Sequence, residues 1–363
     1  MIKIGVDGRL LQGKLTGVGK FVLNLLEYIC ANDTRFSISV YTNKPLECAF
    51  RSERIRVFVD SPVYAKVKPM VWSKFLLHRL LNHDQPDIFF AGDALVPLFI
   101  RKCKIVSLVH DFNQMIAPET MSTLRLISDK LFYKKDIFKA DLILANSGGT
   151  ADKLNHYFGK KADLVVFPLL DPWYRPVDKD LARQRLAERQ ITYPYILTVA
   201  TQEPRKNLDK TIRAFIALKR NGELRNYKLL LVGSKGWKSN SVQDLINQHK
   251  EDVLSPGYIE DELMPFLYAG ADVFVFPSLY EGFGMPVREA LLCGTRVVTS
   301  DIPELREASF NLAEYIDPND ELMLQTAIKK TLDHPSGPVI DELQKKKGDQ
   351  LDRLIPALVY MMN

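Results

Sequence analysis

Alternating strand-type and helix-type patterns run through nearly the whole chain and constrain its fold more than any other feature. Helical patterns such as Leu124–Phe138 and Gly149–Tyr157 lie between apolar runs of strand length. Because these runs lack strict polar alternation, they predict parallel strands that are buried on both faces and covered by helices. In the first part of the chain the runs are residues 2–7, Ser37–Thr42, Ile55–Asp60, Asp87–Ala91, Lys104–Val109, Asp141–Asn146 and Leu164–Pro168.

A segment with three prolines, Pro168–Pro176, divides this pattern in two and predicts an interdomain linker. The chain has 363 residues, which suits two domains better than one. We therefore expect two doubly wound α/β domains, over residues 1–170 and 171–340, that face a central crevice at the carboxyl ends of their strands. In the second part the strand-type runs are Tyr195–Ala200, Lys228–Gly233, Asp272–Pro277 and Thr295–Ser300.

Composition excludes several classes of protein. The hydrophobic share of 46% and the charged share of 26% are those of an ordinary globular protein, and the net charge of +5 is too mild to suggest a nucleic-acid partner. Four scattered cysteines without a CxxC pair argue against a zinc site or a disulfide framework. The chain opens on a strand-like run and has no apolar stretch of about 20 residues, which predicts a cytoplasmic protein.

Two motifs of the first domain could take part in a site. Gly17 and Gly19 lie between the first strand and a helical pattern that runs to Ala31, where backbone amides could bind a phosphate, although a simple tight turn explains them equally well. His110 directly follows the run Lys104–Val109. Such a histidine is more often structural, but its place at the crevice favours a functional role.

A basic loop follows the first strand of the second domain. Arg205 and Lys206 precede Asn207, a candidate N-cap for a helix that Asn221-Gly222 would end. Two cations at a strand end could neutralise a diphosphate leaving group, whereas the alternative is a solvated basic loop.

The most specific motif is the run Pro277–Leu291, which contains Gly-Phe-Gly-Met-Pro between Glu281 and Glu289. One carboxylate is predicted in a glycine loop and the other in the helix that starts near Pro286. An Asp-x-Asp motif, typical of metal-dependent transferases of another fold, occurs at Asp178–Asp180, where a helix start is the better explanation.

Taken together, these motifs resemble the family 4 retaining glycosyltransferases of the GT-B fold, from Asp7 to about Asp317. The resemblance rests on Asp7-Gly8-Arg9, Thr16–Gly19, His110-Asp111, the Ala140–Ser147 strand, the Pro-Arg-Lys-Asn loop and the paired glutamates. It implies an acceptor-binding first domain, a donor-binding second domain and a C-terminal helix over 341–363 that returns to the first domain.

The resemblance also implies roles for single residues. Amides near Gly17 and Gly19 would contact the donor diphosphate, Arg205 and Lys206 its distal phosphate, and His110 the donor sugar. The paired glutamates and the loop between them would hold the rest of the donor: Glu281, Gly282, Phe283, Gly284 and Met285 the transferred sugar, and Glu289 the ribose.

The implied reaction moves a hexose from a nucleotide diphosphate sugar to a glycan or polyprenyl-linked acceptor, with retained configuration and without a metal or other cofactor, since two cations can stabilise the leaving group. Similar members are bacterial mannosyltransferases of surface polysaccharides such as lipopolysaccharide, which favours GDP-mannose. A UDP-sugar donor, a GT-B nucleotide-sugar epimerase and a non-catalytic nucleotide-sugar-binding protein remain alternatives. The sequence departs from the family in residues 308–313, which lack the usual glycines.

Basic and apolar residues are interleaved in Tyr64–Leu81, and a second basic set, Lys130, Lys134, Lys135 and Lys139, follows Ser122. An anionic membrane surface would attract such clusters. We therefore expect peripheral contact with the inner face of the cell membrane, while packing of the apolar residues onto the sheet is the alternative.

Overall fold

The computed structural model describes residues 1–121, 123–236, 239–333 and 351–362, and the chain divides into two compact units. The first unit comprises Met1–Phe112, Thr123–Leu170 and Gly348–Asn363, and the second comprises Asn113–Ser122 and Asp171–Lys347. The main division thus falls after Leu170, inside the proline-rich segment.

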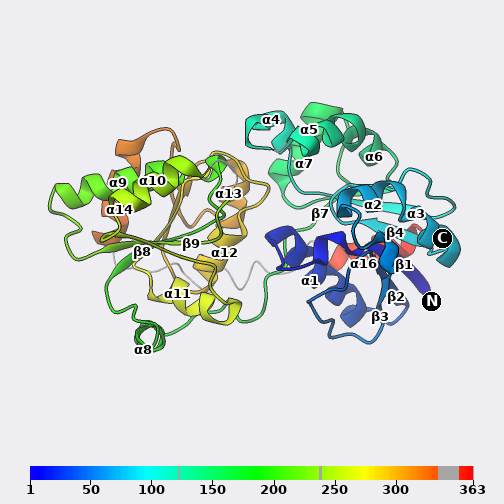
Figure 1. Cartoon of the computed structure of the whole chain (residues 1–363), viewed down its shortest axis with the longest axis horizontal. Helices are drawn as coiled ribbons and strands as arrows, with labels where there is room; N and C mark the ends of the chain where they lie inside the picture. Colours follow the sequence, from blue (N-terminus) through cyan, green and yellow to red (C-terminus); the bar gives the residue numbers. More distant parts are fainter. Residues whose placement is uncertain (122, 237–238, 334–350, 363) are drawn as a thin grey trace. The chain divides into compact units, whose positions relative to one another are not determined.

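The first unit is built on a parallel sheet of seven strands in the order β3-β2-β1-β4-β5-β6-β7, shown in blue to green in Figure 1. The strand order reverses direction between β1 and β4, which is where doubly wound sheets bind ligands. Every predicted strand is present, although the last is shorter than expected. The bounds are β1 Ile2–Asp7, β2 Phe36–Thr42, β3 Ile55–Val59, β4 Ile88–Ala91, β5 Lys104–Val109, β6 Leu142–Ala145 and β7 Leu164–Val165.

Helices cover this sheet, and α1 shows why they form. Thr16 caps the helix by accepting from the Gly19 amide at 3.3 Å, and apolar residues recur on the helix face that packs on the sheet. The helices of this unit are α1 Gly17–Asn32, α2 Pro69–Phe75, α3 His78–Asp84, α5 Thr123–Ser128, α6 Lys134–Phe138, α7 Gly148–Phe158 and α16 Leu354–Tyr360, with short turns η1 Gly8–Leu11, η2 Pro62–Tyr64 and η7 Leu351–Arg353.

The helix predicted over Leu124–Phe138 is interrupted. A π-turn, η4 (Asp129–Tyr133), joins α5 to α6. Through this wide turn two consecutive rings both meet other aromatic groups: Phe132 lies edge-on to Phe75, and Tyr133 lies edge-on to Phe112. Hydrophobic periodicity alone does not reveal the extra residue, so an unbroken helix was expected.

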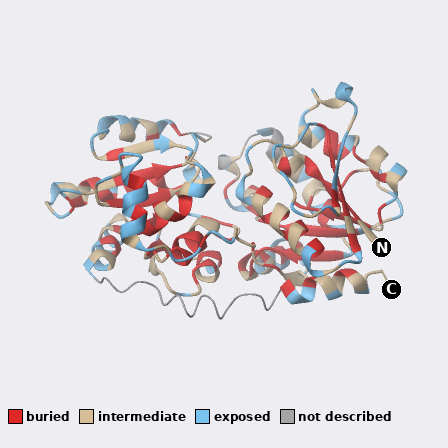
Figure 2. Ribbon diagram, turned by 90° about the horizontal axis from the view of Figure 1, so that it is seen from below, coloured by how far each residue is buried: buried red, intermediate tan, exposed pale blue. Residues whose placement is uncertain are grey.

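The second unit has a parallel sheet of six strands in the order β10-β9-β8-β11-β12-β13. The four predicted strands are confirmed, and two edge strands were missed because one contains Ser255-Pro256-Gly257 and the other has only three residues. Figure 2 shows buried residues concentrated on the strands of both units. The bounds are β8 Tyr195–Val199, β9 Lys228–Val232, β10 Val253–Gly257, β11 Val273–Phe276, β12 Val297–Ser300 and β13 Glu314–Ile316.

The helix starts of the second unit test two predictions. Asp178 caps α8 by accepting from the amides of Asp180 and Leu181, so the Asp-x-Asp motif is a helix start, as predicted. Asn207 precedes α9 but does not cap it, because its side chain donates to two carbonyls elsewhere and its φ is +57°. The helices of this unit are α4 Asn113–Ile116, α8 Lys179–Ala187, α9 Leu208–Arg220, α10 Asn240–Gln248, α11 Met264–Gly270, α12 Met285–Leu292, α13 Pro303–Ala308 and α14 Glu321–Asp333, with turns η3 Pro118–Thr120, η5 Pro204–Lys206 and η6 Asp261–Leu263.

The C-terminal end of the chain packs in the core of the first unit. Leu351, Leu354 and Leu358 are buried there with strands β1, β2 and β4. Residues 341–350 of the predicted return helix lie outside the described residues. None of the described helices is long and apolar enough to cross a membrane.

The structure corrects part of the membrane hypothesis for Tyr64–Leu81. Lys74 is buried and paired with Asp136, and Arg79 pairs with Asp60 at 3.0 Å. Trp72 is completely buried and donates to Asp60. Because Lys74 and Trp72 are buried in these contacts, neither side chain can face a lipid surface.

Candidate functional site

The second unit brings three predicted site residues into direct contact. Turn η5 after β8 carries Arg205 and Lys206, and the loop after β11 carries Glu281. Lys206 Nζ lies 2.5 Å from Glu281 Oε1, and Arg205 Nη1 lies 3.2 Å from Glu281 Oε2. The Leu279 amide donates to the Arg205 carbonyl at 2.8 Å and ties the two loops together. The carboxyl edge of this sheet thus holds one carboxylate between two cations.

Burial makes this cluster electrostatically strong. Lys206 is 8% exposed and Glu281 is 7% exposed. Burial raises the pKa of Glu281, but the charges of Lys206 and Arg205 outweigh it and the pKa falls below its ordinary value. Burial also lowers the pKa of Lys206, against the attraction of Glu281. Arg205 pairs in addition with Glu203, at 3.0 Å.

Gly284 shapes the loop that leads into α12. Its φ is +99°, and a Cβ at this position would lie 2.4 Å from Leu305 Cδ2. A side chain is therefore excluded both by backbone conformation and by packing. The neighbouring predicted residues Gly282 and Met285 are half-buried beside it, and Phe283 is buried.

Phe283 is held by a residue that the sequence reasoning missed. The Arg288 guanidinium lies 4.6 Å from the Phe283 ring centre and 4.0 Å from that of Phe310. It donates to the Glu307 carbonyl at 2.7 Å, and burial lowers its pKa to about 9. Its place one residue before Glu289 was the only signal for it in the sequence.

Glu289 lies in α12, as predicted. Its Oε2 accepts from the Tyr268 hydroxyl of α11 at 2.7 Å. Burial, followed by the charge of Glu289, raises the pKa of Tyr268 well above its ordinary value. Tyr268 therefore stays a hydrogen-bond donor and orients the carboxylate.

The remaining predicted residues belong to the first unit. Gly17 is exposed at the first position of α1, where amides are available to a ligand. Gly19 is buried, and a Cβ there would lie 2.5 Å from the Leu10 carbonyl oxygen. Packing against η1 thus requires a glycine at this position, and its role in ligand binding stays a prediction.

His110 follows β5 and is 9% exposed. Its Nε2 lies 2.6 Å from the Gly92 carbonyl oxygen. Because a carbonyl oxygen only accepts, Nε2 carries the proton in this contact. The ring also meets Phe21 edge-on at 5.7 Å, which fixes its plane.

The sequence also failed to predict Asp93, an acidic residue that directly follows Gly92. Asp93 follows β4 and pairs with Arg9, Nη2 to Oδ2, at 2.5 Å. Arg9 also contacts Asp7 at 3.4 Å, so the Asp7-Gly8-Arg9 motif serves to hold Asp93. Asp93 stands two residues after a predicted strand, the same signal that identified Arg205 and His110.

Comparisons with known proteins identify the family. Residues 15–169 match the model described as Glycosyltransferase Family 4, and residues 179–348 match that described as Glycosyl transferases group 1. A diphospho-undecaprenol 4-alpha-N-acetylgalactosaminyltransferase of Campylobacter jejuni is 30% identical over 271 residues, 70% of this chain and 67% of that protein. The chain belongs to glycosyltransferase family 4.

Two further relatives of this chain, both from Escherichia coli, are mannosyltransferases. The O-antigen chain mannosyltransferase B is 31% identical over 64% of this chain, and the serotype-specific mannosyltransferase WbdA is 31% identical over 91%. The matched segments span only 62% and 44% of the lengths of these two proteins.

Solved structures agree on the architecture. Sucrose-phosphate synthase of Thermosynechococcus elongatus has a TM-score of 0.72 at 18% identity, covering 92% of this chain and 90% of that one. Anabaena HepE in complex with UDP-glucose has a TM-score of 0.70 at 16% identity, covering 100% and 99%. The predicted family and the GT-B fold of two Rossmann-like domains are confirmed.

Proposed function

We propose that this chain transfers a hexose from a nucleotide diphosphate sugar to a glycan or lipid-linked acceptor, with retention of configuration and without a metal. The observation that carries the proposal is the buried contact of Glu281 with both Lys206 and Arg205. Family membership supports the reaction class.

The chemistry follows from the charges. When the anomeric C–O bond breaks, positive charge develops on the sugar and negative charge on the diphosphate. Lys206 and Arg205 would stabilise the diphosphate, and their burial strengthens the interaction because little water screens it. Glu281 holds both cations in place before the donor arrives, so little reorganisation is needed. Glu289, oriented by Tyr268, would accept hydrogen bonds from the ribose.

The stereochemistry is proposed from the same side chains. Glu281 already binds two cations, which makes it a poor nucleophile toward the anomeric carbon. We infer attack by the acceptor hydroxyl on the face that the diphosphate leaves. A new C–O bond forms to the acceptor, and the hydroxyl proton passes to a departing phosphate oxygen.

The donor is proposed to be GDP-mannose, which the mannosyltransferase relatives support. UDP-glucose, bound by HepE, is the second candidate. A thermal-shift panel of GDP- and UDP-sugars tests the choice, because a ligand that binds the folded state raises Tm by mass action. A larger Tm shift with a UDP-sugar than with GDP-mannose would show that the donor is a UDP-sugar. The absence of any Tm shift would contradict donor binding.

Incubation of the protein with the donor and an acceptor extract separates the alternatives. A transferase releases the nucleoside diphosphate and extends the acceptor. An epimerase returns an altered nucleotide sugar, and a binding protein leaves the donor unchanged. Transfer that survives EDTA would support the metal-free proposal, whereas loss on chelation with recovery on adding Mg²⁺ or Mn²⁺ would contradict it.

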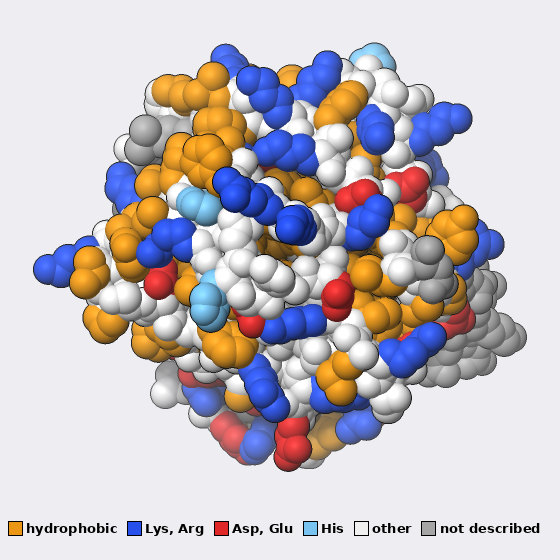
Figure 3. Space-filling view, turned by 90° about the vertical axis from the view of Figure 1, so that its right-hand side faces the viewer, with side chains coloured by type: hydrophobic (Ala, Val, Ile, Leu, Met, Phe, Trp, Pro, Cys, Tyr) orange, Lys and Arg blue, Asp and Glu red, His pale blue; other side chains and the backbone are white. Residues whose placement is uncertain are grey.

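We further propose that the first unit contacts the anionic inner face of the cell membrane through α5, η4 and α6. Ile127, Leu131 and Phe138 are about half exposed there, and lysines of the second basic set are exposed between them. The face drawn in Figure 3 likewise carries many basic side chains beside hydrophobic ones. Anionic lipids would attract each lysine by about 1 kcal/mol, while the apolar side chains enter the interface.

Flotation with anionic and neutral vesicles at low and high salt tests this contact. The double variant Lys134→Glu with Lys135→Glu should bind anionic vesicles more weakly than wild type. A control with the same charge change, Arg213→Glu with Lys250→Glu, alters exposed residues of the second unit and should bind as wild type does. Equal binding of wild type to anionic and neutral vesicles at low salt would contradict the proposal.

A further inference from the structure

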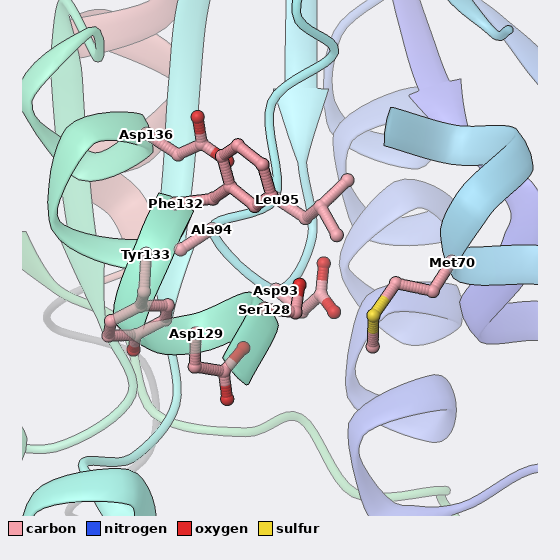
Figure 4. A pocket seen from close by; sticks show the side chains of 9 residues that line it. All are labelled: Met70, Asp93, Ala94, Leu95, Ser128, Asp129, Phe132, Tyr133 and Asp136. Carbon is pink, nitrogen blue, oxygen red and sulfur yellow. The ribbon is translucent and has the colours of Figure 1, made fainter. Parts of the chain in front are cut away.

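Buried charges of this protein are held in two ways. Asp93 and Asp136, which line the hollow of the first unit shown in Figure 4, are each paired with a basic side chain. Arg288 of the second unit is held by backbone carbonyls and aromatic rings. Because a charged group that is only 8% exposed is costly to remove from water, the contacts of Arg288 must outweigh that cost.

The first contacts of Arg288 are with the end of α13. Its Nε donates to the Ala308 carbonyl at 3.0 Å, and its Nη2 donates to the Glu307 carbonyl at 2.7 Å. The last carbonyls of a helix lack partners within the helix and carry partial negative charge, so a cation is favourable there. Arg288 lies in α12 and therefore ties that helix to the carboxyl end of α13.

Two aromatic rings lie against the same guanidinium. Its central carbon is 4.6 Å from the ring centre of Phe283 and 4.0 Å from that of Phe310. A cation over the face of a ring is attracted to it, and more strongly where the contact excludes water. Phe283 belongs to the loop before α12, and Phe310 follows α13. One side chain thus joins this loop to the turn after α13.

The turn after α13 is strained where it supplies that ring. The φ angle is +52° at Phe310 and +60° at Asn311, a region that residues with a Cβ rarely adopt. Such strain persists only where the surrounding contacts outweigh it, and it clusters at functional sites. The glycines usual in this stretch of the family would adopt such a backbone without strain, but they carry no ring. Phe310 therefore gives Arg288 a contact that a glycine cannot make.

The loop before α12 also packs on α13 through its backbone. A Cβ on Gly284 would lie 2.4 Å from Leu305 Cδ2 and 3.5 Å from Ala308 Cβ. The Phe283 side chain is only 3% exposed, so it is too buried to meet a ligand. What this loop contributes to a donor site is therefore its backbone, and the course of that backbone depends on where the Phe283 ring is held.

The motif between the paired glutamates is thus fixed at three points. Glu281 is bonded by two cations, Glu289 by a tyrosine hydroxyl, and the loop between them by Arg288. The family resemblance assigns Glu289 and the two cations to the nucleoside diphosphate, and residues 282–285 to the sugar. Removing the Arg288 guanidinium takes away the middle support and leaves the printed contacts of both glutamates in place.

We propose that Arg288 is a positioning residue for the transferred sugar: it bonds the end of α13, lies over the Phe283 and Phe310 rings, and so fixes the backbone of residues 282–285 against the donor sugar. The proposal rests on the donor site of the proposed function. Arg288 therefore acts on the sugar part of the donor and spares the nucleotide part.

Isothermal titration of the full chain with GDP, GDP-mannose, UDP and UDP-glucose tests the proposal. The readout is the donor ratio, which is the Kd of the nucleotide sugar divided by the Kd of its nucleoside diphosphate, for the pair that wild type binds. Arg288→Met keeps most of the side-chain length and removes the guanidinium. The donor ratio should rise about 5-fold or more, as for the loss of a hydrogen bond to the sugar, while the Kd of the diphosphate stays near its wild-type value.

Phe310→Gly tests the other end of the same contact. It removes one ring, but glycine adopts the positive φ without strain, so Tm should change little while the donor ratio rises. A role in stability alone would not give this combination. Arg79→Met is the matched control in the first unit, because Arg79 lies 4.2 Å from the Tyr64 ring centre and donates to the Leu76 carbonyl at 3.2 Å. It loses the same kinds of contact and should leave the donor ratio unchanged.

A wild-type donor ratio in folded Arg288→Met would overturn the proposal. Equal weakening of diphosphate and nucleotide-sugar binding in that variant would also overturn it, since Arg288 would then serve stability alone. If Arg288→Met does not fold, Phe310→Gly decides, and an unchanged donor ratio there overturns the proposal. A wild type that binds no member of either pair would contradict the proposed function as well, whereas normal wild-type binding with unchanged ratios in the variants contradicts the role of Arg288 alone.

Discussion

Glu281 sits between two cations that come from a loop 75 residues away in the sequence. Removing either partner of a buried pair leaves the other charge uncompensated, which costs far more than the pair contributes. Variants at these positions must therefore be read for stability as well as for activity, and substitutions that keep the shape of the side chain are the most informative.

Glu281→Gln keeps the shape of the side chain and removes its charge. Because Lys206 and Arg205 lose the group that orients them, we expect turnover to fall roughly 10²-fold or more. Steady-state kinetics measure the loss, and circular dichroism verifies the fold. A folded variant with turnover near wild type would exclude Glu281 from the site.

The same variant should change how stability depends on pH. The pKa of Glu281 in the folded chain lies below its ordinary value of 4.5, so its contribution is complete above that pH and is lost as pH falls through the lowered pKa. The difference in the free energy of unfolding between wild type and Glu281→Gln should be constant above about pH 5 and shrink below. Urea unfolding at several pH values measures it, and a constant difference down to pH 3 would contradict the ion-pair assignment.

Lys206→Ala removes one of the two cations. Donor binding should weaken, and more at low than at high salt, because salt already screens the charge. Isothermal titration with the donor at two salt concentrations measures this. A loss of affinity independent of salt would indicate that Lys206 acts through packing alone, for example through its contact with the Phe276 ring at 4.8 Å.

For single residues, the sequence predicted where they lie in the fold better than which side chains they contact. Arg205, Lys206, Glu281 and His110 all follow predicted strands, so their place at a sheet edge was foreseeable. That one carboxylate bridges both cations depends on how two loops fold together. Residues 308–313 lack the glycines usual in the family, yet Phe310 and Asn311 adopt the positive φ that glycine would favour. No sequence pattern predicted this conformation.

Among the elements, the loop before α12 depends most on a single residue. In Gly284→Ala the new Cβ would meet Leu305, which is fully buried in α13, and would also occupy a strained backbone conformation. The backbone conformation alone costs about 1–2 kcal/mol, and overpacking adds about 1–3 kcal/mol. Urea unfolding should therefore show a loss of at least about 2 kcal/mol.

Gly257→Ala is the matched control, because φ there is +83° and nothing lies within 4 Å of the new Cβ. It should show only the backbone cost. Equal losses in the two variants would mean that Leu305 moves aside, and that packing against α13 does not set the start of α12.

Element prediction succeeded where burial imposes a clear pattern. Strand β5 was predicted to the residue, because both of its faces are buried and its apolar run is bounded by Lys104 and His110. The edge strands β10 and β13 were missed because one contains Ser255-Pro256-Gly257 and the other has only three residues. The π-turn η4 was missed because, in a segment this short, the phase shift from one inserted residue cannot be told from ordinary scatter in the hydrophobic pattern.

For the whole molecule, the chain leaves the first unit after Leu170 and its end returns there. Leu354 is completely buried in the core of that unit, beside strands that begin at residue 2. The first unit therefore has its full core only when these C-terminal residues are in place. The family models end at residue 348 and do not include them.

Leu354→Ala tests this dependence on the C-terminal end. Removing a buried leucine should cost the first unit about 2–5 kcal/mol, while the second unit keeps its own core unchanged. Differential scanning calorimetry should show one transition moving to lower temperature, and a donor nucleotide that binds the second unit identifies which transition stays. Tyr360→Ala, at a position that is 81% exposed, is the control and should leave both transitions in place. Two transitions that move together would show that the units unfold as one cooperative body, and an unmoved pair would show that α16 adds nothing to the first core.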